Sequence, residues 1–227
     1  MKRFPLTLLL AGLLICPTLA SCSEQPAEQD SRQATASAQR IVDYEDARRV
    51  FWKELYADGG TTLYCRQLFG PGYNRGINLE HVFPASWVAY SLRCGKRHQC
   101  RERSAEFNRI EADLHNLYPS RSDINEARNN YRFAEIPGER REFGRCDFEY
   151  DERQRLAEPT PAARGRIARA MLYMADEYDL YLKKKQRQLL EDWDREHPPS
   201  DKEHARNARI EHLQGNRNSF IDAHRQR

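Results

Sequence analysis

Glu80 and His81 stand side by side in the stretch NLEHVFPASW (78–87), and their side chains are the two types that metal-assisted acid–base chemistry needs. A carboxylate binds hard divalent cations, and a neutral imidazole accepts a proton near neutral pH. Neighbouring residues of a regular strand point to opposite faces, so the pair can serve one site only at a strand end or a bulge. Most Glu-His dipeptides belong to ordinary surface, so the rest of the chain must decide.

Two other stretches carry groups that would complete such a site. Residues 111–130, EADLHNLYPSRSDINEARNN, are rich in Asn, Asp and His, and an amide oxygen is a neutral ligand suited to a hard cation. A His on a strand with an Asn at the start of the following helix is the layout of ββα-metal nucleases. Residues 93–104 are expected to form a basic loop that could hold a phosphate. That loop contains Arg93, Lys96, Arg97, Arg101 and Arg103 against a single Glu102.

The N-terminus indicates export. MKRFPLTLLLAGLLICPTLASC has a basic start and an apolar run too short to span a bilayer, which is the pattern of a signal peptide. Leu19-Ala20-Ser21-Cys22 resembles a bacterial lipobox, so we expect a lipoprotein-type signal over residues 1–21 and a lipid on Cys22. Ser23, rather than Asp, follows that cysteine and favours the outer membrane, with the protein facing the periplasm or the cell surface. The alternative is ordinary cleavage, giving a soluble periplasmic or secreted protein.

A tether and one domain should follow the signal. Residues 22–39 hold the lipidated cysteine and a segment without large apolar side chains, which cannot offset the entropy of ordering. Residues 40–227 are enough for one domain with its own core. Charged residues make up 31% of the chain, yet the formal net charge is only +3. An anionic substrate must therefore be met by a local patch rather than by overall charge.

Four cysteines lie in the expected domain: Cys65, Cys94, Cys100 and Cys146. In an exported domain they indicate two disulfides, for which three connectivities exist. Cys94 and Cys100 bracket GKRHQ and could close a short loop, which would leave Cys65 with Cys146. A four-cysteine zinc site is disfavoured, because the chain lacks the closely spaced cysteine pair that such sites use.

The elements that must position these groups are mostly helices. Apolar spacing and breakers predict helices over 43–56 (before Gly59 and Gly60), from Ala85, over 105–117 as far as Pro119, and near Ile124, where Asp123 and Glu126 resemble a capping box. Later helices are expected to open at Thr160-Pro161, to end at Pro198-Pro199, and to run from a Ser200–Glu203 capping box to Gly215.

One small β element is expected in the middle of the chain. TTLYC (61–65) and INLEHVF (77–83) predict two short strands on either side of the breaker-rich GPGYNRG, a hairpin-like unit. The fold class predicted is therefore α+β, mainly helical, with a small β element that carries Glu80 and His81.

With these motifs in order, the chain resembles the bacterial endonuclease I family of exported, sequence-nonspecific nucleases with a His-metal (ββα-metal, His-Me finger) site. The resemblance covers nearly all of residues 45–225. It is carried by YC (64–65), NLEHVFPASW (78–87), the Cys94–Cys100 loop, EADLHNLYPS (111–120), INEARNNYRF (124–133), GRC (144–146), AEPTPAARGRIARAMLYMADEYDL (157–180) and LQGNRNSF (213–220).

The resemblance implies a role for each candidate residue. Glu80 and Asn125 would bind Mg²⁺ (with Mn²⁺ or Ca²⁺ as possible substitutes), His81 would be the general base, and Arg97 would stabilise the phosphate. It also implies phosphodiester hydrolysis in DNA, and in RNA as a further substrate, through contacts to phosphates by a monomer. The products would carry 5′-phosphates. The rival function is a non-catalytic envelope lipoprotein that binds nucleic acid; a phosphoesterase for small nucleotides, which would need a closed pocket, is a third possibility.

The chain also departs from the family pattern. It lacks the YCGC stretch and the later cysteines that the family often carries. If those missing cysteines normally form disulfides with one another, the resemblance implies that Cys94–Cys100 and Cys65–Cys146 are the two bridges that remain here. Its Cys94–Cys100 loop is shorter than is usual, so Arg93 or Arg101 could replace Arg97. Alternatives to Asn125 as the amide ligand are Asn116, Asn129 and Asn130.

Overall fold

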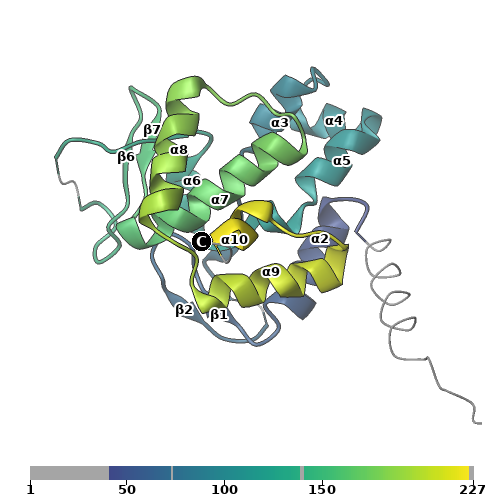
Figure 1. Ribbon diagram of the computed structural model, residues 1–227, viewed down its shortest axis with the longest axis horizontal. Coiled ribbons are helices and arrows are strands. Elements are labelled where there is room, and N and C mark those ends of the chain that lie inside the picture. Colours follow the sequence, from purple (N-terminus) through teal and green to yellow (C-terminus); the bar gives the residue numbers. More distant parts are fainter. Residues whose placement is uncertain (1–40, 73, 139–140, 225–227) are drawn as a thin grey trace, which may run out of the picture.

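The computed structural model describes residues 41–72, 74–138 and 141–224. The expected signal peptide, Cys22 and the tether fall outside these residues. Over them the chain is a mixed helix and strand structure in which helices predominate (Figure 1). The described part contains no helix long and apolar enough to cross a membrane.

The first helix agrees with its prediction. α2 (Tyr44–Val50) begins after Asp43, whose side chain accepts a hydrogen bond from the Asp46 backbone N–H, and it continues as a π-helical turn, η1 (Phe51–Leu55). Gly59 then turns the chain with φ +83°, and a Cβ there would lie 2.2 Å from the Phe69 carbonyl oxygen. Only glycine tolerates this turn, because it has no Cβ. The turn leads into β1 (Gly60–Thr61), which pairs with β2 (Leu68–Phe69).

The central strand pair differs from the expected hairpin. β3 (Ile77–His81) pairs antiparallel with β4 (Leu117–Arg121), so that Glu80 faces Tyr118 and His81 faces Leu117. The helix expected to run to Pro119 is therefore wrong beyond residue 111, and residues 61–65 do not pair with β3. Pro119 lacks an N–H and disfavours strand in local sequence. It is tolerated here because β4 lies at the edge of a two-stranded sheet.

Helices fill the connection between β3 and β4: α3 (Ala85–Ser91), α4 (Arg97–Arg103), α5 (Ala105–Glu111) and the 3₁₀ turn η2 (Leu114–Asn116). The basic segment expected as a loop thus contains α4. α6 (Ser122–Arg128) follows β4 at once. The capping box predicted there does not form, because Asp123 pairs with Arg121 and accepts from the Ile124 N–H.

The C-terminal helices match their start and stop signals. α7 (Pro161–Glu177) begins with proline at its first position, α8 (Lys184–Glu196) stops before the two prolines, and α9 (Asp201–Gln214) ends at Gly215 with φ 92°. Ser200 caps α9 as expected, but the Glu203 side chain turns to Arg169 instead of closing the box. A short α10 (Ser219–Ala223) follows.

A third small sheet was not expected. β5 (Arg132–Phe133) lies parallel to β7 (Leu156–Glu158), which pairs antiparallel with β6 (Glu149–Asp151). In Figure 1 it lies beyond α7 and α8, at the side of the molecule away from α3, α4 and α5.

The core is organised around α7, which packs side by side with α8 (Figure 1). Its buried face includes Ile167, Met171 and Met174 and joins residues from the N-terminal half such as Tyr64 and Phe83 in one apolar cluster. A smaller cluster lies between α2, η1, the β3–β4 pair and α9. The strand pair therefore has packed helices on both sides.

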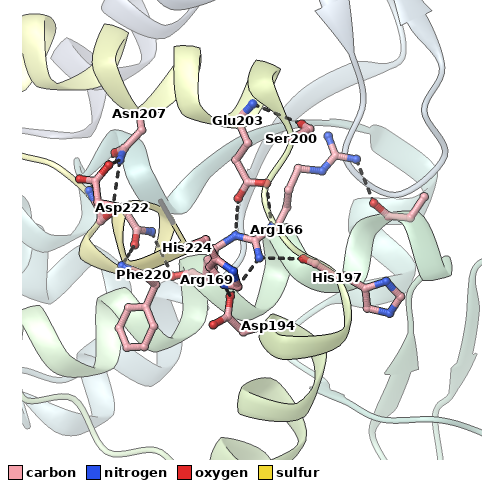
Figure 2. A network of polar contacts seen from close by, with 12 residues as sticks. Arg166, Arg169, Asp194, His197, Ser200, Glu203, Asn207, Phe220, Asp222 and His224 are labelled. Carbon is pink, nitrogen blue, oxygen red and sulfur yellow. Dashed lines mark hydrogen bonds and ion pairs between the residues drawn. The ribbon is translucent and has the colours of Figure 1, made fainter. Parts of the chain in front are cut away.

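Polar contacts also tie the C-terminal helices together (Figure 2). Arg169 of α7 is almost fully buried and pairs with Glu203 of α9, at 2.7 Å from Nε to Oε1, and with Asp194 of α8, at 2.9 Å. His224 Nε2 lies 3.0 Å from Asp194 as well. Three helices thus meet on one guanidinium.

Two disulfides cross-link the domain. Cys94 joins Cys100 around the start of α4, and Cys65 joins Cys146 across 81 residues of sequence. All four cysteines are therefore oxidised in pairs, which excludes the four-cysteine zinc site.

Candidate active site

The candidate site is built on β3, β4 and the helix α6 that follows them. α6 contacts both strands, and its last residue, Arg128, reaches back to the end of β3. Arg128 is 1% exposed, and its Nη1 and Nη2 donate to the carbonyl oxygens of His81 (3.3 Å) and Val82 (2.5 Å). A buried cation with several acceptors holds its contacts in one geometry. Arg128 thereby fixes the strand end that carries Glu80 and His81.

Glu80 lies on the side of β3 that faces the main core. The Tyr64 hydroxyl donates to its Oε1 at 2.6 Å, and Arg128 Nε lies 3.4 Å from the same oxygen. Burial raises the pKa of the Glu80 carboxyl, while the positive charge of Arg128 and the Tyr64 hydrogen bond act in the opposite direction. Both side-chain contacts are made to Oε1.

His81 addresses a different set of neighbours, as the alternation of a strand requires. Its Nε2 lies 3.0 Å from the backbone carbonyl oxygen of Glu111. A carbonyl only accepts, so Nε2 carries the proton and Nδ1 has the lone pair in the neutral ring. Burial first, and then the positive charge of Arg97, lower the pKa of His81 to about 4. The imidazole is therefore neutral at neutral pH, as a proton acceptor must be.

Two arginines meet beside His81 on one carboxylate. Arg97 Nε contacts Oε1 of Glu111, and Arg101 Nε lies 2.7 Å from Oε2 of the same fully buried side chain. The ring of Tyr44 lies under both guanidinium groups, at 5.3 Å from Arg97 Cζ and 4.8 Å from Arg101 Cζ. The same ring lies 5.3 Å from the His81 ring. This cluster gives a fixed positive region next to the candidate base.

Arg97 thus lies beside His81, and of its two alternatives only Arg101 shares that place. Arg93 lines a different hollow, together with Tyr90 and Tyr181. Both Arg97 and Arg101 remain partly exposed, at 45% and 36% of the side chain. Each can therefore reach an incoming phosphate while Glu111 restrains it.

Asn125 lies against β3 from the second turn of α6. Its Nδ2 donates to Asn78 Oδ1 (2.8 Å) and to the Leu79 carbonyl oxygen (3.0 Å). Within the described part of the chain nothing donates to its Oδ1, which leaves that oxygen free to accept or to bind a cation. The residue stands beside the backbone that immediately precedes Glu80.

The side-chain amides of the three alternative residues, Asn116, Asn129 and Asn130, form hydrogen bonds to other groups. Asn116 is buried and uses both ends of its amide on the backbone of Phe83, at 2.6 and 3.0 Å. Asn129 Oδ1 accepts from the next backbone N–H, and the Asn130 amide bonds to Ser86 and Arg155. Among the four candidates, Asn125 is therefore the one whose carbonyl oxygen is available beside β3.

Local sequence reasoning missed the supporting residues Tyr64, Glu111 and Arg128. All three fall inside motifs that the family resemblance picked out, but nothing in their spacing assigns them a role. Asp113, in the same EADLHNL motif, is another: it accepts from the hydroxyls of Tyr173 and Tyr178 at 2.8 and 2.6 Å and so anchors η2 to α7. Their partners are far away in sequence, which is why pattern reading could not find them.

The donor set is compatible with a hard cation but not with a cluster of many ligands. Among residues 41–72, 74–138 and 141–224, no group of three or more His, Cys, Asp and Glu side chains is arranged to hold a metal ion. One carboxylate with one amide oxygen is a set of two, and Mg²⁺ is typically held by one or two protein ligands while it keeps several waters. Glu80 and the free Oδ1 of Asn125 would together make a set of that size.

Comparison with known proteins gives a consistent result. The family model for Endonuclease I matches residues 27–225. A periplasmic deoxyribonuclease of Aeromonas hydrophila is 45% identical over 150 residues, covering 64% of this chain and 63% of that protein's length. An extracellular deoxyribonuclease of Aeromonas hydrophila is 43% identical over 213 residues, covering 83% of this chain and 92% of its own length.

A more distant relative extends the comparison. Endonuclease-1 of Buchnera aphidicola subsp. Acyrthosiphon pisum (strain APS) is 33% identical over 182 residues, which cover 78% of this chain and 72% of the relative. The family model spans the described domain with all the candidate residues. The chain belongs to the endonuclease I family.

Proposed function

We propose that this protein is an exported, sequence-nonspecific endonuclease that hydrolyses phosphodiester bonds of DNA with the help of a divalent metal ion, leaving 5′-phosphates. The observation that carries the proposal is the arrangement at the end of β3. There a neutral, buried His81 faces two arginines, while Glu80 and the free carbonyl oxygen of Asn125 flank the same strand. Relatives named deoxyribonuclease agree with this activity.

His81 is assigned the role of general base. The Glu111 carbonyl holds the proton on Nε2, so Nδ1 is the atom that accepts a proton from the attacking water. The low pKa of His81 keeps that atom unprotonated at neutral pH. A base with so low a pKa accepts protons weakly, so proton removal needs a water that is itself made more acidic.

Glu80 and Asn125 would hold Mg²⁺, for which Mn²⁺ or Ca²⁺ could substitute, and when bound the ion supplies positive charge to the phosphate and to the departing 3′-oxygen. Tyr64 and Arg128 keep the Glu80 carboxylate in place before any ligand arrives. The pKa of the Glu80 carboxyl is raised by burial, which a bound cation would oppose by favouring the ionised form.

Arg97 is assigned the contact with the scissile phosphate, with Arg101 beside it. A guanidinium binds phosphate oxygens through two parallel hydrogen bonds. Contacts of this kind carry no base information, which accounts for cleavage without sequence preference. The same contacts would also accept RNA, which is the second substrate to be tested.

The rival function is a non-catalytic envelope lipoprotein that binds nucleic acid on the same scaffold. The free Asn125 oxygen and the neutral His81 argue against it, because binding alone requires neither. The proposed location is the outer membrane, through a lipid on Cys22. If a Cys22→Ser protein still partitions with membranes, the proposed lipid anchor is refuted. If the variant becomes soluble, the anchor is supported.

The decisive experiment is plasmid cleavage by the purified, disulfide-bonded chain. We expect supercoiled plasmid to be nicked and degraded with Mg²⁺ and to stay intact with EDTA. His81→Ala should cut at least about a hundredfold more slowly than wild type, and His212→Ala, which alters an exposed histidine of α9, should cut like wild type. An intact plasmid with every divalent metal would refute the nuclease assignment, and full activity of His81→Ala would refute the assigned base.

A further inference from the structure

A second basic surface lies away from the candidate catalytic residues. It is a groove of about 790 Å³ between the start of α7, the end of α8, one face of α9 and the β1–β2 turn. None of Glu80, His81, Arg97 or Asn125 lines it. The basic residues on its wall are Arg66, Arg166, Arg169, Lys202, Arg206 and Arg209, and the acidic ones are Glu196 and Glu203.

α9 supplies half of the positive charge in this groove. Lys202, Arg206 and Arg209 follow one another at spacings of four and three residues, which places them on one face of the helix. Lys202 and Arg209 are exposed, and neither has a carboxylate partner in the described part of the chain. Their charges are therefore free to attract an anion.

Arg206 forms the floor of the groove and stays positively charged. Its guanidinium donates to the carbonyl oxygens of Leu114 (2.8 Å) and Leu117 (2.6 Å), with Cζ 4.0 Å from the centre of the Tyr118 ring. Carbonyls and a phenol ring position a cation without neutralising it. Within the described part of the chain Arg206 forms no salt bridge, although the charge of Glu203 acts on it and favours its protonated form.

The opposite wall adds the start of α7. Within the described part of the chain the Arg166 side chain donates one hydrogen bond, to the carbonyl oxygen of Ala162 in its own helix, at 3.3 Å. α7 has 17 residues and no acidic side chain in its first turn, and its N-cap residue Thr160 makes no capping hydrogen bond. The positive end of the helix dipole therefore adds to the field. Figure 2 shows Arg166 near Ser200 and Glu203, where α7 meets the start of α9.

The acidic residues do not cancel this charge. Glu203 uses both carboxylate oxygens on Arg169, at 2.7 Å each, and Arg169 also pairs with Asp194, so Arg169 adds no net positive charge to the groove. The groove wall then carries one negative charge, on Glu196, and five positive charges on the remaining basic residues. A concave surface with this excess of positive charge concentrates polyanions.

We propose that this groove is an exosite that binds the phosphate backbone of nucleic acid at a distance from the residues that cut it. The inference rests on the proposed function, since the groove would be a second binding site for the nucleic acid that the candidate active site cuts. A backbone held at two places dissociates more slowly than one held only at the catalytic residues. The groove is also far larger than a single phosphate, which fits a stretch of backbone.

The test measures binding separately from cleavage, with the exported chain purified with its disulfides formed. In EDTA, binding of a short DNA duplex is measured at several salt concentrations for wild type and for Arg66→Gln/Lys202→Gln/Arg209→Gln. All three substituted side chains are exposed. The control, Arg153→Gln/Lys184→Gln/Lys185→Gln, removes the same charge from exposed positions outside the groove.

We expect the groove variant to bind at least about tenfold more weakly than the control at low salt. The slope of log K against log salt should fall by about 2 to 3, since each lost phosphate contact removes about 0.9. The small substrate bis(p-nitrophenyl) phosphate cannot extend into the groove. The groove variant should therefore hydrolyse it with Mg²⁺ as fast as wild type does, while its KM for plasmid rises.

Equal affinity and salt slope for the two variants would overturn the exosite. So would a groove variant that loses binding to phosphatidylglycerol vesicles but keeps binding to DNA, because the groove would then recognise lipid headgroups. Failure of the proposed function looks different. In that case wild type leaves plasmid uncut with Mg²⁺, whatever the two variants do in EDTA.

Discussion

Nε2 of His81 lies 3.0 Å from the backbone carbonyl oxygen of Glu111, whose carboxylate also binds Arg97 and Arg101. One residue therefore orients the candidate base and gathers the candidate phosphate contacts. Glu111 comes from the end of α5 and His81 from the end of β3, thirty residues earlier. The relationship would make Nδ1 of His81 the proton acceptor in the proposed reaction, and it leads to the first prediction.

His81→Ala should lower kcat on plasmid by about 10²- to 10⁴-fold, the usual contribution of a positioned base. Added imidazole should restore part of the rate, because the cavity left behind lies next to Arg97 and Tyr44. The measurement is initial nicking rate against imidazole concentration. A loss that imidazole does not relieve, together with an unfolded circular dichroism spectrum, would mean that His81 serves structure instead.

Tyr64→Phe should weaken the proposed metal binding without removing the proposed ligand, Glu80. The hydroxyl holds Oε1 of Glu80 at 2.6 Å in a buried setting, and loss of a partner that orients a ligand typically costs about tenfold or more in metal affinity. Unfolding should also become easier by about 2 kcal/mol, as for other hydrogen bonds to a charged group. Mg²⁺ titration of activity and urea unfolding measure the two effects.

Tyr90→Phe is the matched control for this change, because Tyr90 is 80% exposed. It should leave both the Mg²⁺ titration and the unfolding midpoint as in wild type. If Tyr64→Phe has the same Mg²⁺ dependence as this control, Tyr64 does not position Glu80.

The two disulfides should contribute unequally to stability. Cys65 and Cys146 close a loop of 81 residues, whereas Cys94 and Cys100 close one of 6. In the chain-entropy model the longer loop restricts the unfolded chain more, by roughly 2 kcal/mol. Thermal unfolding of the Cys65→Ala/Cys146→Ala and Cys94→Ala/Cys100→Ala proteins measures this. A larger loss from the short bridge would show that native packing around α4, rather than loop entropy, dominates.

Stability should fall as pH drops below about 6.5, partly through His115. Burial is the main cause that lowers the pKa of this histidine in the folded protein. The unfolded chain therefore binds more protons below pH 6.5, the ordinary pKa of histidine, and the free energy of unfolding decreases as pH falls toward the folded value. Above that range the residue has no effect. Urea unfolding across this pH range should show a shallower decline for His115→Gln than for wild type; parallel curves would exclude His115.

Arg169→Met should destabilise the protein by about 3 to 5 kcal/mol. The change leaves the buried Glu203 and the mostly buried Asp194 without their cation, and uncompensated buried charge is costly. Arg169→Met/Glu203→Leu should lose less than Arg169→Met alone, because one stranded charge is removed. Equal losses in the single and double variants would show that the pair contributes through packing rather than charge.

Much of the helical framework follows from local chemistry. Proline at the first position of α7, the two prolines after α8, the serine cap of α9 and Gly215 at its end all act within a few residues, so the sequence predicts these boundaries. The candidate residues Glu80, His81, Arg97 and Asn125 also stand out from the sequence, through their types and the family motifs around them.

Only the tertiary structure decided how the central strand is paired and what surrounds it. β3 pairs with β4, about forty residues later, instead of with residues 61–65 as expected. The sequence of β4, LYPSR, contains a proline, and nothing local in it favours a strand that includes one. The partners of the candidate residues, Tyr64, Glu111 and Arg128, are chosen by packing between distant segments. The same packing leaves Asn125, rather than Asn116, with a free oxygen beside β3. Residue types are local facts, whereas neighbours depend on long-range contacts that no short pattern encodes.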